Sequence, residues 1–397
     1  MDLSAIGFDT SRLFVSATQQ SQQLEQIANT ALSEGMTLYQ EGNYAEAADA
    51  FRRSVALAPT SDNAQTAADY MASSYIKIGR IDKAADAYKT SMQLDPTNDA
   101  PVVKLANLYF AEERYQEAST QYEKAVRLNP SADNYFSLGQ SYLALEEYSQ
   151  AESAFNKVVS LDSDSTNGYY GLGQTYNKME HYDDAVLQFK TAIEKDDTFY
   201  AAYAELGYNY ADMGLTDEAQ ELVDFLEDND EDLADTLSRY IYKVDEPQIM
   251  FASSESSFPK SLSVNTPLSV LDSYLSNAGA TQSFTMIFQF SKDMDRESVE
   301  NIFNWSITRA NGTSLIDKYN FGFSIPDTEV SLKSFPDFVY YDSENLTAKL
   351  TFSIQQNDNA DGTIDPSHIV FTFKGEDAYG NKMNSDYDEY SGFSGVA

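Results

Sequence analysis

The stretch EGNYAEAADAFRRSVALAP, residues 41–59, contains the pattern that decides the fold of the first half of the chain. Ala47 is followed four residues later by Phe51, so both side chains lie on one face of a helix. The helix has to end before Pro59, because proline cannot continue a helix and restricts the residue that precedes it. The stretch therefore predicts a helix that approaches its neighbours through a small residue and places an aromatic ring beside it.

The same pairing of alanine and aromatic returns four more times, at an interval of about 34 residues. The later pairs are Ala84 and Tyr88, Ala118 and Tyr122, Ala151 and Phe155, and Ala185 and Phe189. Each pair is preceded by another helical stretch, in which Gly139, Gly173 and Gly207 allow close approach of two helices. This period resembles the tetratricopeptide repeat (TPR) family, and the resemblance covers about half of the chain. It implies an all-α superhelical solenoid built from helix pairs.

The resemblance divides the first part of the chain into three segments. Residues 28–229 are expected to hold six repeats, starting near Asn29, Gln65, Asp99, Ala132, Thr166 and Tyr200, the sixth of them degenerate because Val223 replaces the aromatic residue. Residues 230–246 are expected to form a capping helix and linker, since a solenoid end needs one polar face. Residues 1–27 either cap the first repeat or dock in a groove, their own or a neighbour's, through an apolar stripe that includes Leu13, Leu24, Ile27 and Leu32.

The geometry of the TPR family implies a concave wall, lined by first-helix side chains that the stacking does not need. The wall residues expected to bind a partner are Asn107, Phe110, Phe136, Gln140, Tyr170, Gln174, Asn177 and Tyr208. Amides hydrogen-bond the backbone of an extended segment, and aromatic faces bury its side chains. TPR proteins that bind acidic chaperone tails use clustered Lys and Arg, whereas here Lys77, Lys104 and Lys178 are well separated. The wall therefore favours a protein or peptide segment other than such a tail.

From Pro247 onward the hydrophobic period changes from helical to alternating, which is typical of strands. Three expected strands each place a row of apolar residues on one face. The rows are Phe284, Met286, Phe288 and Phe290 in the first strand, Leu346, Ala348, Leu350, Phe352 and Ile354 in the second, and Ile369, Phe371 and Phe373 in the third. Several such strands separated by Asn, Asp, Gly and Pro indicate an all-β antiparallel sandwich over residues 247–397.

The stretch FQFSKDMDRESVENIFNWSI, residues 288–307, resembles the bacterial Ig-like module of cell-surface proteins. A later Asp-x-x-Gly-Asn turn of that family is matched by Asp377, Gly380 and Asn381. The resemblance implies that Met294, Val299, Phe303 and Trp305 plug the sandwich edge, and that Ser298 and Asp295 support the turn. The expected fold class is thus multidomain, a TPR solenoid followed by an Ig-like sandwich.

Charge and composition exclude several classes of partner and of site. The chain has 26 basic and 63 acidic residues and a formal net charge of -37, so nucleic acid and anionic membranes would be repelled. Cysteine is absent, which excludes disulfides and thiolate metal sites. No apolar run is long enough to insert into a membrane, and the N-terminus has no secretory signal pattern. The compartment stays open between the cytoplasm, leaderless export to the cell surface and export with a removed leader.

The loop NDNADGTID, residues 357–365, is the one stretch that resembles a calcium loop. Asn357 stands where Asp is usual and His368 where a bidentate Glu would stand, and a hairpin turn needs the same residue types. We therefore expect no cofactor and no metal. No nucleophile motif, phosphate-binding loop or dinucleotide fingerprint occurs, which predicts a protein that is not an enzyme.

The favoured function is a non-enzymatic adaptor or scaffold that binds a protein segment on the concave TPR face. The alternative is a structural subunit of a bacterial surface or filament-associated assembly, which contacts copies of itself. A third hypothesis is an enzyme that uses carboxylates of the sandwich.

Overall fold

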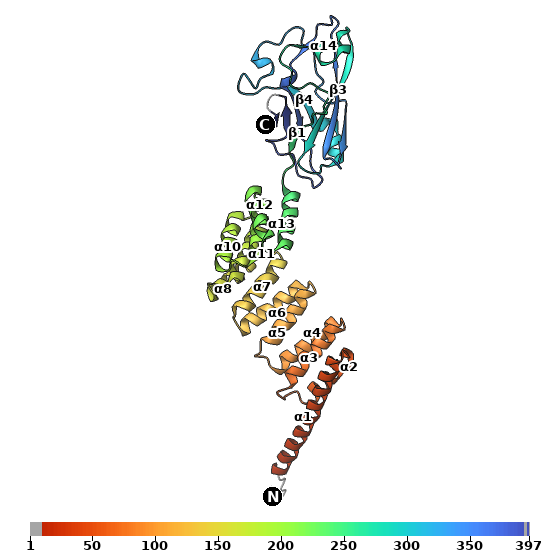
Figure 1. Cartoon of the computed structure of the whole chain (residues 1–397). Coiled ribbons are helices and arrows are strands. Elements are labelled where there is room, and N and C mark those ends of the chain that lie inside the picture. The colour runs from red at the N-terminus through yellow and green to blue at the C-terminus, as the bar shows by residue number, and fades with distance from the viewer. Residues whose placement is uncertain (1–9, 393–394, 397) are drawn as a thin grey trace, which may run out of the picture. The chain divides into compact units, whose positions relative to one another are not determined.

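The computed structural model of the chain describes residues 10–392 and 395–396. The chain divides into two compact units, Met1–Asn209 and Tyr210–Ala397. The described part of the first unit is entirely helical, and the second begins with helices and continues in antiparallel strands (Figure 1).

Thirteen helices follow one another before the first strand in the described residues. They are α1 (Thr10–Gln40), α2 (Tyr44–Leu57), α3 (Ala64–Lys77), α4 (Ile81–Leu94), α5 (Ala100–Ala111), α6 (Tyr115–Leu128), α7 (Ala132–Ala144), α8 (Tyr148–Leu161), α9 (Thr166–Lys178), α10 (Tyr182–Lys195), α11 (Tyr200–Asp212), α12 (Thr216–Glu227) and α13 (Glu231–Val244). From α1 to α10 each helix packs against the next, as the succession of ribbons in Figure 1 shows. The long helix α1 continues through the predicted N-terminal segment, where Leu24 and Ile27 are 37% and 54% exposed; residues 1–9 lie outside the described part.

Close packing of the helices depends on the predicted pairing of small residues with aromatic rings. Phe155 is fully buried and lies between a glycine of its own repeat and one of the next repeat. A Cβ atom on Gly139 would be 2.6 Å from the Phe155 ring, and one on Gly171 would be closer still. Gly173 stands in the same relation to Phe189, at 2.6 Å. The rings therefore fill space that only glycine leaves open.

The turn inside each helix pair has the same backbone conformation. One residue per turn has a positive φ: Gly42, Gly79, Glu113, Glu146, Glu180 and Gly214. The next residue donates its N–H to a carbonyl near the end of the preceding helix, for example Arg114 to Tyr109 at 2.8 Å and Leu215 to Tyr210 at 2.9 Å. This is the Schellman closure of a helix, which usually uses glycine at the left-handed position. The pair formed by α11 and α12 shares this closure, and Val223, which stands at the aromatic position of that pair, is buried.

The second unit contains two four-stranded antiparallel sheets and a short two-stranded one in the described residues. Their orders are β1-β3-β6-β5, β10-β9-β8-β4 and β2-β7. The strands are β1 (Ile249–Ala252), β2 (Thr266–Pro267), β3 (Thr281–Phe290), β4 (Trp305–Arg309), β5 (Phe338–Asp342), β6 (Thr347–Gln355), β7 (Thr363–Ile364), β8 (Ile369–Phe373), β9 (Glu389–Ser391) and β10 (Gly395–Val396). Two short helices lie between strands, α14 (Leu268–Leu271) and α15 (Arg296–Glu300). We call the described part of the second unit from β1 onward the two-sheet body.

One hydrophobic core joins the two larger sheets. Phe288 of β3 stacks on Trp305 of β4 with ring centroids 5.7 Å apart, and lies 5.6 Å from Phe371 of β8. The inward positions predicted for the three strands are buried, with one exception. Leu346 is half-buried and precedes β6 with a φ of 52°, because the turn between β5 and β6 closes there.

The segment between β3 and β4 plugs the core as predicted, except for one residue. Met294, Val299 and Trp305 are buried, and the Trp305 indole N–H donates to the Val299 carbonyl at 2.8 Å. The Asp295 carboxylate accepts from the Ser298 N–H at 2.6 Å, which caps α15. Phe303 is not buried: it is 71% exposed and meets the Phe335 ring with centroids 5.5 Å apart. It lies in a one-turn 3-10 helix, Ile302–Asn304, that turns its side chain away from the core.

A buried lysine of this segment holds the end of α13. Lys292 Nζ lies 2.7 Å from the Asp377 carboxylate and donates to the Asp245 carbonyl at 2.8 Å. Its ammonium also lies over the rings of Tyr242 and Tyr379, 5.1 and 5.4 Å from their centroids. We call these five residues the Lys292 socket.

The predicted turn around Gly380 supplies the acidic side of the socket. The Asp377 carboxylate accepts from the N–H groups of Tyr379 and Asn381, both at 2.8 Å, and Gly380 has a φ of 89°. Burial alone raises the pKa of Asp377, but hydrogen bonds from Lys292 and Asn381 outweigh burial and hold the pKa below its ordinary value. The carboxylate is therefore the stable form inside this turn.

Candidate functional site

Polar side chains link the first helices of three successive helix pairs. Gln140 on α7 donates from Nε2 to Gln174 Oε1 on α9 at 3.4 Å. Gln174 in turn donates from Nε2 to Glu205 Oε1 on α11 at 3.1 Å. The bonded residues come from equivalent helices in consecutive repeats, so these helices present one continuous face. We call it the first-helix wall.

Tyr170 on α9 joins the same chain of hydrogen bonds. Its hydroxyl donates to Glu205 Oε1 at 3.3 Å, and its ring meets Phe199 edge-on with centroids 5.0 Å apart. Burial raises the pKa of the Tyr170 hydroxyl, and the nearby Glu205 charge raises it further. The hydroxyl therefore remains a donor at physiological pH. Gln140, Tyr170, Gln174 and Glu205 together are called the Glu205 ladder.

Glu205 is the residue of this site that the sequence analysis missed. It is half-buried on α11, and no ion pair with Lys or Arg involves it in the part of the chain that the structure describes. The signal that could have found it is the repeat period: Glu205 follows Tyr170 by 35 positions in the sequence, as Lys104 follows Asp69. It lies one helical turn before the predicted Tyr208, which is half-buried.

An aromatic and an amide pair flank the ladder. Phe136, one turn before Gln140 on α7, is half-buried with its ring centroid 5.7 Å from that of Phe155. Asn177, on α9, donates from Nδ2 to the fully buried Asn209 Oδ1 at 3.0 Å. The structure thus brings the predicted residues of α7, α9 and α11 onto the wall.

The two predicted residues of α5 bond within their own repeat. Asn107 is exposed, and its Oδ1 accepts from the Tyr122 hydroxyl on α6. The Phe110 ring meets Tyr115 with centroids 5.2 Å apart. No hydrogen bond within the described residues connects either of them to the Glu205 ladder.

The cations of the wall do not form a cluster. Lys104 Nζ lies 2.6 Å from Asp69 Oδ2, so its charge is already paired. Asp69 also accepts from the Ser91 hydroxyl at 2.9 Å. Lys77 and Lys178 are exposed on α3 and α9. A clamp for terminal carboxylates needs several unpaired cations together, and this arrangement does not provide them.

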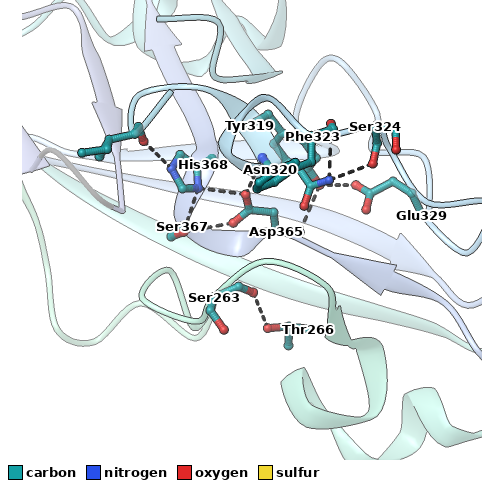
Figure 2. Close-up of polar contacts among 11 residues, drawn as sticks. Ser263, Thr266, Tyr319, Asn320, Phe323, Ser324, Glu329, Asp365, Ser367 and His368 are labelled. Atoms are coloured by element: carbon teal, nitrogen blue, oxygen red, sulfur yellow. Dashed lines mark hydrogen bonds and ion pairs between the residues drawn. The ribbon is translucent and has the colours of Figure 1, made fainter. Parts of the chain in front are cut away.

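A second polar cluster lies inside the two-sheet body, and Figure 2 shows Asp365, Ser367 and His368 pointing toward one another. His368 Nδ1 lies 2.8 Å from Asp365 Oδ2 and 3.0 Å from the Ser367 hydroxyl. His368 Nε2 lies 2.8 Å from the Ile316 carbonyl and donates to it, since a carbonyl only accepts. In a hydrolase triad serine and aspartate contact opposite ring nitrogens, whereas here they share one. The cluster is therefore not arranged to activate Ser367.

The same cluster fixes a strained piece of backbone. Asn320 donates its N–H to Asp365 Oδ2 at 2.8 Å, as drawn in Figure 2. Asn320 and Phe321 both have left-handed φ values, 53° and 51°. Non-glycine residues rarely adopt this conformation unless the surroundings impose it. Asp365 and His368, each 1% exposed, supply that constraint.

Two side chains of the loop 357–365 are hydrogen-bonded to each other. Asn357 Nδ2 donates to Asp361 Oδ1 at 2.7 Å, and the Asp361 N–H donates back to Asn357 Oδ1 at 3.2 Å. Gln356 Oε1 accepts from the Gly362 N–H at 2.9 Å, and Asp365 belongs to the buried cluster. This is the hydrogen bonding of a turn. Within residues 10–392 and 395–396, no three His, Asp or Glu side chains gather as metal ligands would, and no helix is long and apolar enough to cross a bilayer.

Family profiles described as tetratricopeptide repeat match residues 28–61, 71–98, 103–166 and 166–197. These four stretches of the helical unit are therefore tetratricopeptide repeats. The solved structures similar to this chain include a TPR protein from Parabacteroides merdae ATCC 43184, with 16% identity, a TM-score of 0.47, and coverage of 55% of this chain and 89% of that one. YrrB, described as a TPR protein with an unusual peptide-binding site, has 23% identity, a TM-score of 0.38, and coverage of 48% and 99%. MamA from Desulfovibrio magneticus RS-1 has 18% identity, a TM-score of 0.38, and coverage of 45% and 97%. No curated protein matches the chain.

Proposed function

We propose that this protein is a non-enzymatic adaptor that binds an extended protein segment on the first-helix wall of its TPR array. The observation that carries the proposal is the Glu205 ladder, in which side chains of three successive repeats form one polar strip beside aromatic rings. Solenoids bind partners along such extended faces, because every repeat contributes side chains at equivalent positions. The strip crosses three repeats, which suits an extended chain better than a compact ligand.

The chemistry of the wall fits a peptide backbone with apolar side chains. Gln140 and Gln174 each have donor and acceptor atoms, so they can exchange their mutual bond for bonds to a passing peptide group. The half-buried rings of Phe136 and Tyr170 are available to cover side chains of the segment. Rigid aromatic residues bury a large area at a low cost in side-chain entropy.

We assign the two-sheet body to a bacterial Ig-like module that docks or spaces the protein. The turn of Asp377, Gly380 and Asn381 and the segment carrying Lys292 support this assignment, because together they hold the end of α13. A non-enzymatic role is supported by the His368 cluster, whose serine and aspartate share one ring nitrogen.

The alternative function, a subunit of an assembly of identical copies, is favoured by one observation. Helix α1 is 31 residues long and extends well beyond the 14-residue helix α2 that packs against it. Leu24 and Ile27 on this extension are exposed, and exposed apolar stripes promote association of helices. Light scattering at increasing protein concentration separates the two functions, since an adaptor stays monomeric or dimeric.

Affinity capture from the native cell, with quantitative mass spectrometry, tests the adaptor. The full chain and Tyr170→Ala are compared as baits, and Tyr169→Ala is the matched control. Tyr169 is the preceding residue on α9, and its hydroxyl donates to the Ser163 carbonyl at 3.3 Å, away from the ladder. Tyr170→Ala is expected to lose at least nine-tenths of the captured partner while Tyr169→Ala keeps it. Equal capture by all three baits would refute the wall as the binding site.

A further inference from the structure

We infer that the segment bound on the first-helix wall is basic, and that one of its lysine or arginine side chains pairs with Glu205. This inference rests on the proposed function, since it names the chemistry of the partner for the same wall.

The first argument is the bonding of the Glu205 carboxylate. Its Oε1 atom accepts from both Tyr170 and Gln174, whereas its Oε2 atom accepts no hydrogen bond from the described residues. Lys178, one turn after Gln174 on α9, is exposed and makes no ion pair with Glu205 in the described part of the chain. A half-buried carboxylate with one open oxygen and no cation gains strongly from a cationic ligand.

The second argument is the position of this carboxylate beside aromatic rings. The Tyr170 ring donates through its hydroxyl to Glu205 and contacts Phe199 at 5.0 Å and Phe189 at 6.0 Å. A cation that reaches Glu205 therefore passes close to the Tyr170 ring. Lysine and arginine are attracted to aromatic faces, and both have apolar stems that the rings would cover.

The third argument is charge complementarity over the whole chain. The formal net charge of -37 repels an acidic segment and attracts a basic one before contact. Of the wall lysines, Lys104 on α5 is paired with Asp69, and Lys178 on α9 forms no ion pair with Glu205 among the residues that the structure describes. The polarity of this wall is thus opposite to that of a clamp for acidic tails.

The test selects random dodecapeptides displayed on phage against the full chain and measures one selected peptide by fluorescence anisotropy. The variant is Glu205→Gln, which keeps an acceptor for Tyr170 and Gln174 but removes the charge. The control is Glu194→Gln, which removes one charge from an exposed position on α10. Circular dichroism establishes that both variants are folded.

The selected peptides are expected to be enriched in Lys or Arg next to apolar residues. Glu205→Gln should weaken the chosen peptide about five- to tenfold, as expected for a partly desolvated ion pair, and Glu194→Gln less than about twofold. A peptide in which Glu replaces the cation should no longer bind the native chain. The same peptide should bind the variant Glu205→Lys, in which the charges are exchanged.

Two other results overturn the inference and distinguish it from the proposed function. Peptides that require Tyr170 but bind Glu205→Gln with full affinity would refute a basic segment and leave the adaptor intact. Peptides that bind both Tyr170→Ala and Glu205→Gln with the full affinity of the native chain would refute both.

Discussion

Replacing Lys292 by methionine tests how the two-sheet body holds α13. Methionine keeps the apolar stem of the side chain but removes the ammonium. Removal of the ammonium breaks the 2.7 Å ion pair with Asp377, the hydrogen bond to the Asp245 carbonyl and the contacts with the rings of Tyr242 and Tyr379.

The size of the effect follows from burial. The side chains of Lys292 and Asp377 are 3% and 0% exposed, so Asp377 would remain as a buried charge without a cation. Removing one partner of a buried pair costs about 3–5 kcal/mol in the free energy of unfolding. For a unit of this length, that corresponds to a fall of about 10 °C in the melting temperature.

The assay uses the only tryptophan of the chain as a local probe. Trp305 is buried in the two-sheet body, with its ring centroid 4.5 Å from that of Phe373, so its fluorescence reports unfolding of that body. Circular dichroism at 222 nm follows mainly the TPR helices. We expect Lys292→Met to lower the fluorescence transition and to leave most of the helical transition in place.

Lys349→Met is the control, because Lys349 is exposed on β6. A surface change of this kind should alter the unfolding free energy by less than about 0.5 kcal/mol. If Lys292→Met lowered the free energy of unfolding by less than about 1 kcal/mol, or by no more than Lys349→Met, the Lys292 socket would not stabilise the packing of α13 on the two-sheet body.

Three further predictions concern the acid dependence, a turn and calcium. Folding lowers the pKa of Asp377 below its ordinary 3.8, so the ionised carboxyl stabilises the native state above pH 3.8, and this contribution is lost as the pH falls further. Between about pH 5 and pH 3 the two-sheet body should therefore lose more stability in the native chain than in Asp377→Asn. Denaturant titration measures both losses, and equal losses would contradict the prediction. Glu146→Gly should raise the free energy of unfolding of the helices by about 0.5 kcal/mol, because Glu146 has a φ of 60°, which glycine adopts without strain. Glu147→Gly, at a φ of -85°, should give no such gain. Calcium at 1 mM should barely move the Trp305 transition, whereas a site with a Kd of about 10 μM would add about 2.7 kcal/mol; a large shift abolished by Asp361→Ala would show that the loop binds the ion.

The repeats could be predicted from the sequence because their determinants are local. An alanine and an aromatic ring four residues apart specify one face of one helix, and proline marks the end of that helix. Phe155 occupies the predicted position between glycines of two repeats. The strands with Phe288, Phe352 and Phe371 were predictable for the same reason, since alternation assigns one face to the core.

The errors lie where the conformation of a turn decides the outcome. Leu346 continues the alternating pattern of β6, yet the preceding turn leaves it with a positive φ outside the strand. Phe303 looks like a core residue, but a 3-10 turn directs it outward. The residue type of Glu205 gives no sign of a site, because a carboxylate on a helix is typical of a solvated face. Its role depends on Tyr170 and Gln174, which reach it from the neighbouring repeat.

The account's central claim is that the first-helix wall binds a protein segment. The most direct measurement is the affinity of a dodecapeptide, selected on the full chain, for the double variant Phe136→Ala and Tyr170→Ala, with Tyr169→Ala as control and circular dichroism to establish folding. Truncating one buried aromatic anchor commonly costs about 2 kcal/mol or more, so the double variant should bind at least about tenfold more weakly. Full affinity in the double variant, together with loss of binding on deletion of residues 1–26 or of the two-sheet body, would contradict the account.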